Sequence, residues 1–323
     1  MKRQPAAILG VAAVLFSTAC GSETNGGKKQ FLVAFSQANN AEPYRAMQNA
    51  LMQKLFAQYP DVRLVISDAQ QDNSKQVGQV ETFIRQKPDL LIVAPNERAA
   101  LTAVMGQAMD AKIPVICLER DILQPNYTSY VHSDNVAIGR LAGQFIVDSL
   151  TKKYGKPKGK VVAMRGLLGV EGEINRDKGA REVLQKYPEI QIVADPVADW
   201  IQAKAKDRMT EVLRAQPQID VVYGHNDPMA IGAYLAAKEL NREKEMIFVG
   251  VDGLGGEAGG IKKVMDGVLA ATFVYPLCVD KAVEIANRML HEPGFRPEKE
   301  YTLDSVMVTP ENAAQLYQQY TVK

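Results

Sequence analysis

The sequence predicts an α/β protein built from two doubly wound parallel-sheet domains. From residue 31 onward one unit recurs: an apolar, β-rich run, a polar turn, and a stretch with apolar residues at helical spacing. The apolar runs are nearly continuous, which is typical of parallel strands covered by helices on both faces. There are too many such runs for one comfortable sheet, and 323 residues are enough for two domains.

The predicted strands follow one another along the chain, with helical stretches between them. They are FLVAFS (31–36), RLVISD (63–68), LLIVAP (90–95), VICLE (115–119), KVVAMRG (160–166), IQIVADPV (190–197), VVYGHN (221–226), MIFVGVD (246–252) and AATFVYP (270–276). Apolar residues at helical spacing predict helices over 44–59 and 135–150. The segment TKKYGKPKGK (151–160) is rich in lysine and glycine and predicts a loop. We place the first domain boundary near 130–135, where a new helix begins.

The chain begins with MKRQPAAILGVAAVLFSTACGS, which has the pattern of a secretory signal: a basic start, a short apolar stretch and then small residues. We expect a signal peptide over 1–19 and a lipid on Cys20, although Ser17 stands where a lipoprotein signal usually has Leu. Ordinary cleavage at the same place would leave an exposed thiol, which favours the lipoprotein. Residues 20–30 are small and polar and predict a flexible tether. We therefore expect the mature protein to work outside the cytoplasm.

The composition argues against several classes of function. The 38 basic and 37 acidic residues leave a net charge of +1, which gives no electrostatic reason to expect nucleic acid or an anionic membrane surface as partner. No apolar run reaches the roughly 18 residues needed to span a bilayer. Cys117 and Cys278 lie among apolar neighbours, and the sequence leaves open whether they are buried thiols or a bridge.

Polar residues follow the predicted strands at their carboxyl ends. They are Ser36, Asp68, Glu119, Arg120, Asn226, Asp227 and Asp252. In open α/β sheets, ligands bind beyond these ends. Two domains whose strand ends face each other would therefore enclose a polar cleft.

The sequence holds only weak signals for catalysis. DGLGGEAGG (252–260) loosely fits a dinucleotide fingerprint, but Asp252 would lie beside the phosphate, so we interpret it as a Gly-rich turn. His225 and Asp227 could form an acid–base pair, yet strand alternation turns His225 and Asn226 to opposite faces. We expect His225 to be a partly buried structural residue. With few, well-separated histidines and neither a P-loop nor a nucleophile elbow, we predict no enzyme, cofactor or metal site.

The run PVICLERDI (114–122) places Glu119 beside Arg120 at the end of an apolar strand. Such a pair can be catalytic, a structural salt bridge, or a clamp for a polar ligand. A sugar hydroxyl donates one hydrogen bond and accepts two, which suits carboxylate acceptors and guanidinium donors. Trp200 and Tyr44 are candidates for covering the C–H faces of a ring, with core packing as the alternative for each. These residue types favour a neutral polyhydroxyl ligand.

Several short stretches occur in an order and spacing that is specific to one family. They are FSQANN with EPYR (35–45), IPVICLERDI (113–122), SDNVAIGRLAG (133–143), INRDKGA (174–180), GHNDPMAIGA (224–233) and VGVDG (249–253). On these stretches the chain, from about Phe31 to its C-terminus, resembles the periplasmic pentose- and hexose-binding proteins of bacterial ABC importers. It is most similar to their galactofuranose-binding branch.

The resemblance implies the type I periplasmic binding protein fold, in which a three-segment hinge joins two Rossmann-like lobes. It implies an N-terminal lobe of 31–133 and 276–304, a C-terminal lobe of 134–275 and 305–323, and crossings near Ser133–Asp134, Tyr275–Pro276 and Asp304–Ser305. The ligand contacts that it implies are Ser36, Asn40, Tyr44, Arg45, Glu119, Arg120, Arg176, Trp200, Asn226, Asp252 and Tyr275.

Two of these positions depart from the family pattern. Glu119 stands where the family usually has Asp, so its carboxylate reaches one methylene further, and Tyr275 stands where Gln or Glu is common. Both departures weigh against ribose itself and leave open a smaller, differently oriented or furanose ligand.

The resemblance also implies partners and a location. We expect a monomer in the periplasm or cell envelope that captures a monosaccharide and delivers it to an ABC permease, with no nucleic acid and with membrane contact only through the lipid on Cys20. The alternative is a binding protein that reports its sugar or polyol to a membrane receptor. Lac-repressor-type regulators share the fold but need a DNA-binding segment where this chain has its signal. An enzyme of extracellular sugars would need its acid–base pair from residues 119–121.

Overall fold

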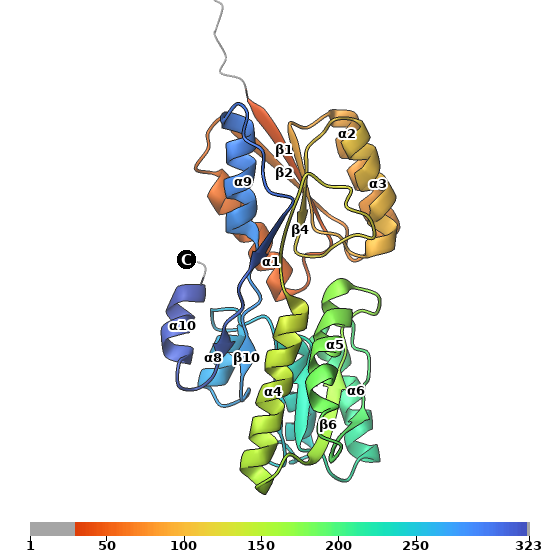
Figure 1. Cartoon of the computed structure of the whole chain (residues 1–323), viewed down its shortest axis with the longest axis vertical. Helices are drawn as coiled ribbons and strands as arrows, with labels where there is room; N and C mark the ends of the chain where they lie inside the picture. The colour runs from red at the N-terminus through yellow and green to blue at the C-terminus, as the bar shows by residue number, and fades with distance from the viewer. Residues whose placement is uncertain (1–29, 322–323) are drawn as a thin grey trace, which may run out of the picture.

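The structure, a computed structural model that describes residues 30–321, consists of two α/β lobes that lie one above the other in Figure 1. Parallel sheets flanked by helices confirm the predicted fold class, and each predicted strand is present. Cys20 and the signal peptide predicted for 1–19 lie outside the described residues, as does most of the predicted tether.

The first lobe is built on a sheet of six strands in the order β11-β5-β4-β3-β1-β2, and every neighbouring pair is parallel. In chain order its strands are β1 (Phe31–Gln37), β2 (Val62–Asp68), β3 (Leu90–Val93), β4 (Val115–Leu118), β5 (Ser129–Ser133) and β11 (Glu300–Leu303). Its helices are α1 (Pro43–Phe56), α2 (Asn73–Gln86), α3 (Arg98–Asp110) and α9 (Val279–His291).

Both faces of this sheet are buried, because successive side chains of a strand point to opposite faces. In β1, Val33 and Phe35 pack with α1 and α9, while Ala34 packs with α2 and α3. Burying an apolar side chain of this size fully contributes about 1.5–3 kcal/mol. The continuous apolar runs therefore hold a layer of helices on each face of the sheet. The polar residues follow these runs at the carboxyl ends of the strands.

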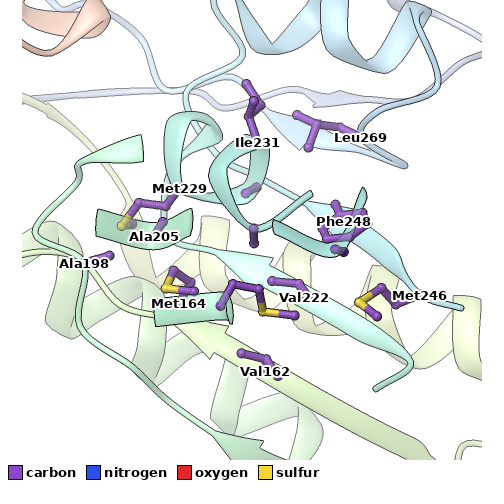
Figure 2. Packing of buried hydrophobic residues seen from close by; sticks show 14 of the residues in the cluster. Val162, Met164, Ala198, Ala205, Val222, Met229, Ile231, Met246, Phe248 and Leu269 are labelled. Carbon is purple, nitrogen blue, oxygen red and sulfur yellow. The ribbon is translucent and has the colours of Figure 1, made fainter. Parts of the chain in front are cut away.

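The second lobe is built on four parallel strands in the order β7-β6-β8-β9, beside a separate antiparallel pair. The strands are β6 (Gly159–Met164), β7 (Ile190–Ala194), β8 (Val221–Gly224) and β9 (Ile247–Val249), with β10 (Thr272–Phe273) and β12 (Met307–Val308) as the pair. Its helices are α4 (Asn135–Tyr154), α5 (Glu171–Leu184), α6 (Gln202–Ala215), α7 (Asp227–Glu239), α8 (Gly260–Met265) and α10 (Ala313–Tyr320). Figure 2 shows one of its cores, in which Met164, Val222 and Phe248 pack between the sheet and the helices.

The two predicted helices differ from the structure at their ends. The loop predicted for 151–160 is wrong in its first part, because α4 continues to Tyr154. Tyr154 packs on the core and its hydroxyl donates to Asp220 Oδ1 at 2.5 Å, so the helical pattern continues past Leu150. Gly155 then ends the helix with a φ of 72°, a conformation that glycine adopts readily. The helix predicted for 44–59 spans Pro43–Phe56 instead, with proline at its first turn.

The chain passes between the two sheets at three places. It does so between β5 and α4, between β10 and α9, and between β11 and β12. Hydrogen bonds tie these segments together: Ser133 Oγ donates to the carbonyl of Leu303 at 2.7 Å, and Ser305 Oγ donates to the carbonyl of Val274 at 2.7 Å. Three adjacent connections of this kind allow the lobes to move as bodies about a hinge. The residue at which each lobe begins stays a prediction.

Within residues 30–321, no helix is both long enough and apolar enough to cross a membrane.

Candidate functional site

The candidate site is a cleft between the lobes, at the carboxyl ends of the strands. It is narrow, with about 310 Å³ of empty space that includes open solvent, and it is lined from both sides by Glu42, Tyr44, Arg45, Glu119, Arg120, Val170, Gly172, Arg176, Trp200, Asn226, Asp252 and Tyr275. A larger hollow of about 1060 Å³ lies on the hinge side and shares Asp252 and Tyr275 with the cleft. We place the site in the smaller cleft because buried charged and aromatic side chains converge there.

All but two of the predicted ligand residues line this cleft. Ser36 is fully buried, and its Oγ accepts a hydrogen bond from Gln76 Nε2 of α2 at 3.3 Å. Asn40 is exposed, and its Oδ1 accepts from Asn49 Nδ2 at 3.1 Å. Sequence reasoning missed three lining residues, Glu42, Val170 and Gly172. Glu42 is the first residue of the EPYR segment, so its place just before two predicted ligand residues could have indicated that it lines the cleft.

The first-lobe wall carries a buried charge cluster centred on Glu119. Arg45 Nη2 of α1 lies 2.5 Å from Glu119 Oε2, and Arg120 Nε lies 3.7 Å from the same oxygen. Burial alone would raise the pKa of Glu119, but Arg45 and Arg120 together hold it below its ordinary value. Burial and the neighbouring Arg45 lower the pKa of Arg120. Glu119 is therefore an ionised carboxylate whose first partner is Arg45.

The second-lobe wall holds Arg176 by different contacts. Its Nε donates to Asn135 Oδ1 at 2.8 Å, and its Nη1 donates to the backbone carbonyl of His225 at 2.6 Å. The nearest carboxylate oxygen, Asp252 Oδ1, lies 3.9 Å from Nη1. The guanidinium also lies over the Tyr275 ring, 4.4 Å from its centroid. Neutral oxygen atoms and an aromatic face thus fix this cation.

Asn226 and Asp252 reach the cleft from the ends of β8 and β9. Asn226 caps α7, since its Oδ1 accepts from the Met229 amide at 2.9 Å, while its Nδ2 donates to the carbonyl of Trp200 at 3.1 Å. Burial raises the pKa of Asp252 well above its ordinary value, and the neighbouring Asp227 raises it further. Asp227 accepts from the Gly253 amide at 2.8 Å, and burial raises its pKa to about 7.

His225 does not line the cleft, although its neighbour Asn226 does. It was expected to be partly buried and is instead fully buried. Among the described residues neither ring nitrogen has a hydrogen-bond partner, and Asp177 Oδ1 lies 3.9 Å from Nε2. Burial lowers the pKa of His225 well below its ordinary value, and Arg176 lowers it further. We interpret His225 as a neutral residue that is buried behind the residues lining the second-lobe wall of the cleft.

Three aromatic rings complete the lining. Tyr44 and Tyr275 stack with ring centroids 5.4 Å apart, and the Tyr44 hydroxyl donates to the carbonyl of Pro276 at 2.6 Å. The guanidinium groups of Arg120 and Arg176 lie 5.8 Å and 5.7 Å from the centroid of the Trp200 ring. Within residues 30–321, its buried Nε1 has no hydrogen-bond partner. A buried N–H donor at the wall of a cleft is suited to a ligand oxygen.

The backbone is unusual at three of the lining residues. Glu119, Trp200 and Asp252 have φ values of 67°, 70° and 127°, a region that residues other than glycine rarely adopt. Gly166 allows the Trp200 geometry, because a Cβ there would lie 2.2 Å from the indole ring. Backbone strain of this kind persists only where the surroundings impose it, and it clusters at functional sites.

The question left open above about the two cysteines is answered by the structure. Cys117 and Cys278 are both free and buried. No group of three or more His, Cys, Asp or Glu side chains within residues 30–321 is placed to hold a metal ion. The cleft offers guanidinium donors, carboxylate and carboxyl groups, an amide and aromatic faces, which is the set that binds hydroxyl-rich compounds.

Comparisons with known proteins agree with this geometry. A family model described as a periplasmic binding protein domain matches residues 33–290. The ribose import binding protein RbsB of Bacillus subtilis is 30% identical over 301 residues, which cover 90% of this chain and 94% of that protein. The galactofuranose-binding protein YtfQ of Escherichia coli is 31% identical over 290 residues, covering 87% and 88%.

A solved structure extends the comparison. The fructose-binding periplasmic domain of a hybrid two-component system superimposes with a TM-score of 0.84 at 37% identity, and the match covers 90% of this chain and 94% of that one.

Proposed function

The chain belongs to the periplasmic binding protein family, and from this premise we propose that it captures a monosaccharide in the interlobe cleft and delivers it to an ABC permease. The observation that carries the proposal is the cleft itself. Three guanidinium groups, three acids and three aromatic rings converge on it from both lobes. Carboxylates offset most of the positive charge, so the site suits a neutral ligand with many hydroxyl groups.

Binding would close the lobes, because contacts come from both walls. Arg45, Glu119 and Arg120 belong to the first lobe, and Arg176, Trp200 and Asp252 to the second. A ligand that touches both sets stabilises the closed form relative to the open one. Tyr44 and Trp200 would cover the apolar faces of the ring, and Trp200 Nε1 would donate to a ring or hydroxyl oxygen.

We propose no chemical step on the bound sugar. Solute binding is the property of the family, and two of the cleft's acids have cationic neighbours, which supports a binding role: Glu119 is neutralised by Arg45, and Asp252 lies beside Arg176. The location and anchoring belong to the same proposal, with the protein in the periplasm or cell envelope, monomeric and held by a lipid on Cys20. Incorporation of labelled palmitate into the native chain but not into Cys20→Ser tests the anchor.

Sensing is the second candidate, and one observation favours it. The fructose-binding domain that is 37% identical belongs to a hybrid two-component system rather than to an importer. Uptake of labelled sugar by cells with and without this chain separates the two roles, since only the importer role requires the chain for uptake.

A thermal-shift screen over D-ribose, D-galactose, D-fructose, L-arabinose and polyols tests sugar capture. A ligand that binds only the folded protein, at 100 times its Kd, stabilises it by about 2.7 kcal/mol. Trp200 is the chain's one tryptophan and lies in the cleft, so quenching or a shift of its emission reports binding independently. If no sugar or polyol moves either signal, the proposal fails. Conversion of the bound sugar would instead support the enzyme alternative.

A further inference from the structure

We propose that Asn135 is a positioning residue, which holds Arg176 in its ligand-facing orientation and links it to two of the hinge crossings. Asn135 does not line the cleft. It is buried, at 1% exposure, and is the first residue of α4, directly after the chain passes from the first sheet to the second. The inference rests on the proposed function for its ligand, since Arg176 is assigned there as a ligand contact.

The side-chain amide of Asn135 makes three hydrogen bonds, one as acceptor and two as donor. Its Oδ1 accepts from Arg176 Nε at 2.8 Å. Its Nδ2 donates to Glu171 Oε2 at 2.8 Å and to the Tyr275 hydroxyl at 3.2 Å. One acceptor and two donors are what this arrangement requires, and among small side chains only an amide supplies both. A carboxylate keeps the contact with Arg176 but loses both donations.

These contacts connect the cleft to the hinge. Asn135 follows the first crossing, and Tyr275 lies in the second, between β10 and α9. The Tyr275 hydroxyl also lies 3.4 Å from the backbone carbonyl of Glu119, on the opposite wall. A change in the angle between the lobes therefore moves Tyr275 relative to Asn135. The orientation of Arg176 depends in this way on how far the lobes have closed.

Close packing of α4 on α5 makes this short contact possible, and the two helices lie side by side in Figure 1. A Cβ at Gly139 would lie 2.3 Å from the carbonyl oxygen of Arg176, and one at Gly179 would lie 2.2 Å from that of Val136. Only glycine permits such an approach. The backbones are therefore held at the distance at which an Asn side chain can reach the arginine.

The test compares Asn135→Ala with a matched control. Asn175 also donates to Glu171, through the other carboxylate oxygen, but it makes no hydrogen bond to Arg176 among the described residues. Asn175→Ala therefore removes an amide from the same acid without touching the arginine. Asn135→Asp is the conservative variant, because it keeps the oxygen that faces Arg176.

Binding is measured by Trp200 fluorescence, with the tightest-binding sugar among D-ribose, D-galactose, D-fructose and L-arabinose. A lost hydrogen bond to a charged group corresponds to about a tenfold change or more in an equilibrium. We expect Asn135→Ala to weaken binding about tenfold or more and Asn175→Ala to stay within about threefold of the native protein. Asn135→Asp should bind more tightly than Asn135→Ala, because it keeps the acceptor for Arg176, but less tightly than the native protein, because it loses both donations. Circular dichroism confirms that each variant is folded.

A second readout needs no ligand. In ¹⁵N-labelled protein, the Arg176 Nε–H, assigned by its absence in Arg176→Lys, is expected to be protected from exchange in the native chain and in Asn175→Ala. It should exchange rapidly in Asn135→Ala. The proposal is overturned if that proton stays protected in Asn135→Ala, or if folded Asn135→Ala binds as tightly as the control. If no sugar binds the native protein, the proposed function fails, and the exchange measurement still decides the role of Asn135.

Discussion

On the first-lobe wall of the cleft, Arg45 and Arg120 share one carboxylate, whereas Arg176 on the second-lobe wall is held mainly by neutral oxygen atoms. The distance from Arg45 Nη2 to Glu119 Oε2 is 2.5 Å, while Arg176 Nη1 is 3.9 Å from Asp252 Oδ1. Burial raises the pKa of both acids, but Arg45 and Arg120 bring the pKa of Glu119 below its ordinary value, whereas that of Asp252 ends well above it.

The difference shows two ways to keep a buried cation. A short ion pair neutralises the charge but makes each partner depend on the other, because an unpaired buried charge is very costly. Hydrogen bonds to neutral oxygens tolerate changes of charge nearby but depend on exact placement of their acceptors. The first wall should therefore be sensitive to loss of charge, and the second wall to loss of geometry.

Removing the charge of Glu119 is the strongest way to test this contrast. Glu119→Gln removes the carboxylate nearest to the buried Arg45 and Arg120, and we expect the free energy of unfolding to fall by about 3–5 kcal/mol. Asp252→Asn is the matched change on the second wall and should cost clearly less, because Arg176 keeps its bonds to Asn135 and His225. Urea denaturation followed by Trp200 emission measures both. Equal losses of unfolding free energy in the two variants would contradict the proposed difference between the two walls.

Arg120 should matter more for binding than for stability. Glu119 keeps Arg45 as its close partner when Arg120 is absent, so Arg120→Ala should fold normally while its affinity for the sugar falls by about 100-fold or more. Arg45→Met is the control, since it removes the close partner and should destabilise the fold. Calorimetric titration gives the affinity and thermal denaturation the stability. Unfolding of Arg120→Ala would mean that the Glu119–Arg120 pair is structural.

Much of this fold could be predicted because its signals are local. Continuous apolar runs predicted nine of the strands, but β5, β11 and β12 were missed. Strand β11 lies at the sheet edge with a half-exposed pattern, and β12 has only two residues, so neither carries an apolar run. Their pairing depends on segments far away in the sequence: Glu300 is in register with Tyr130.

The candidate site could also be predicted only where local sequence signals mark its residues. Residues at strand ends were predicted, because topology alone brings those ends together. The partner of Glu119 was not, since Arg45 comes from a distant helix and only the tertiary structure places the two at 2.5 Å. The extra methylene of Glu119, which the sequence suggested would extend toward the ligand, reaches Arg45. No role was predicted for Asn135, because that role depends on partners that lie far away in the sequence. Two of them belong to α5, and the third is Tyr275.

The smallest expected effect is a difference in how the two walls respond to pH. Burial raises the pKa of Glu171, the acid beside Asn135, from 4.5 to about 7. Between these values the folded protein holds a proton that the unfolded chain releases, so stability falls as the pH rises from about 4.5 to 7 and is constant above that range. The slope is at most about 1.4 kcal/mol per pH unit for one group.

Glu119 on the first wall has the opposite sign, because its pKa is lowered: its contribution is complete above pH 4.5 and is lost only as the pH falls further. We therefore expect melting temperatures between pH 5 and 7 to fall less steeply for Glu171→Gln than for the native protein. Some slope should remain, because the pKa of Asp227 is also raised to about 7. Glu182→Gln, which alters a half-exposed ion pair with Arg140, should leave the slope unchanged. An unchanged slope in Glu171→Gln would mean that Glu171 is already ionised in the folded protein at pH 5.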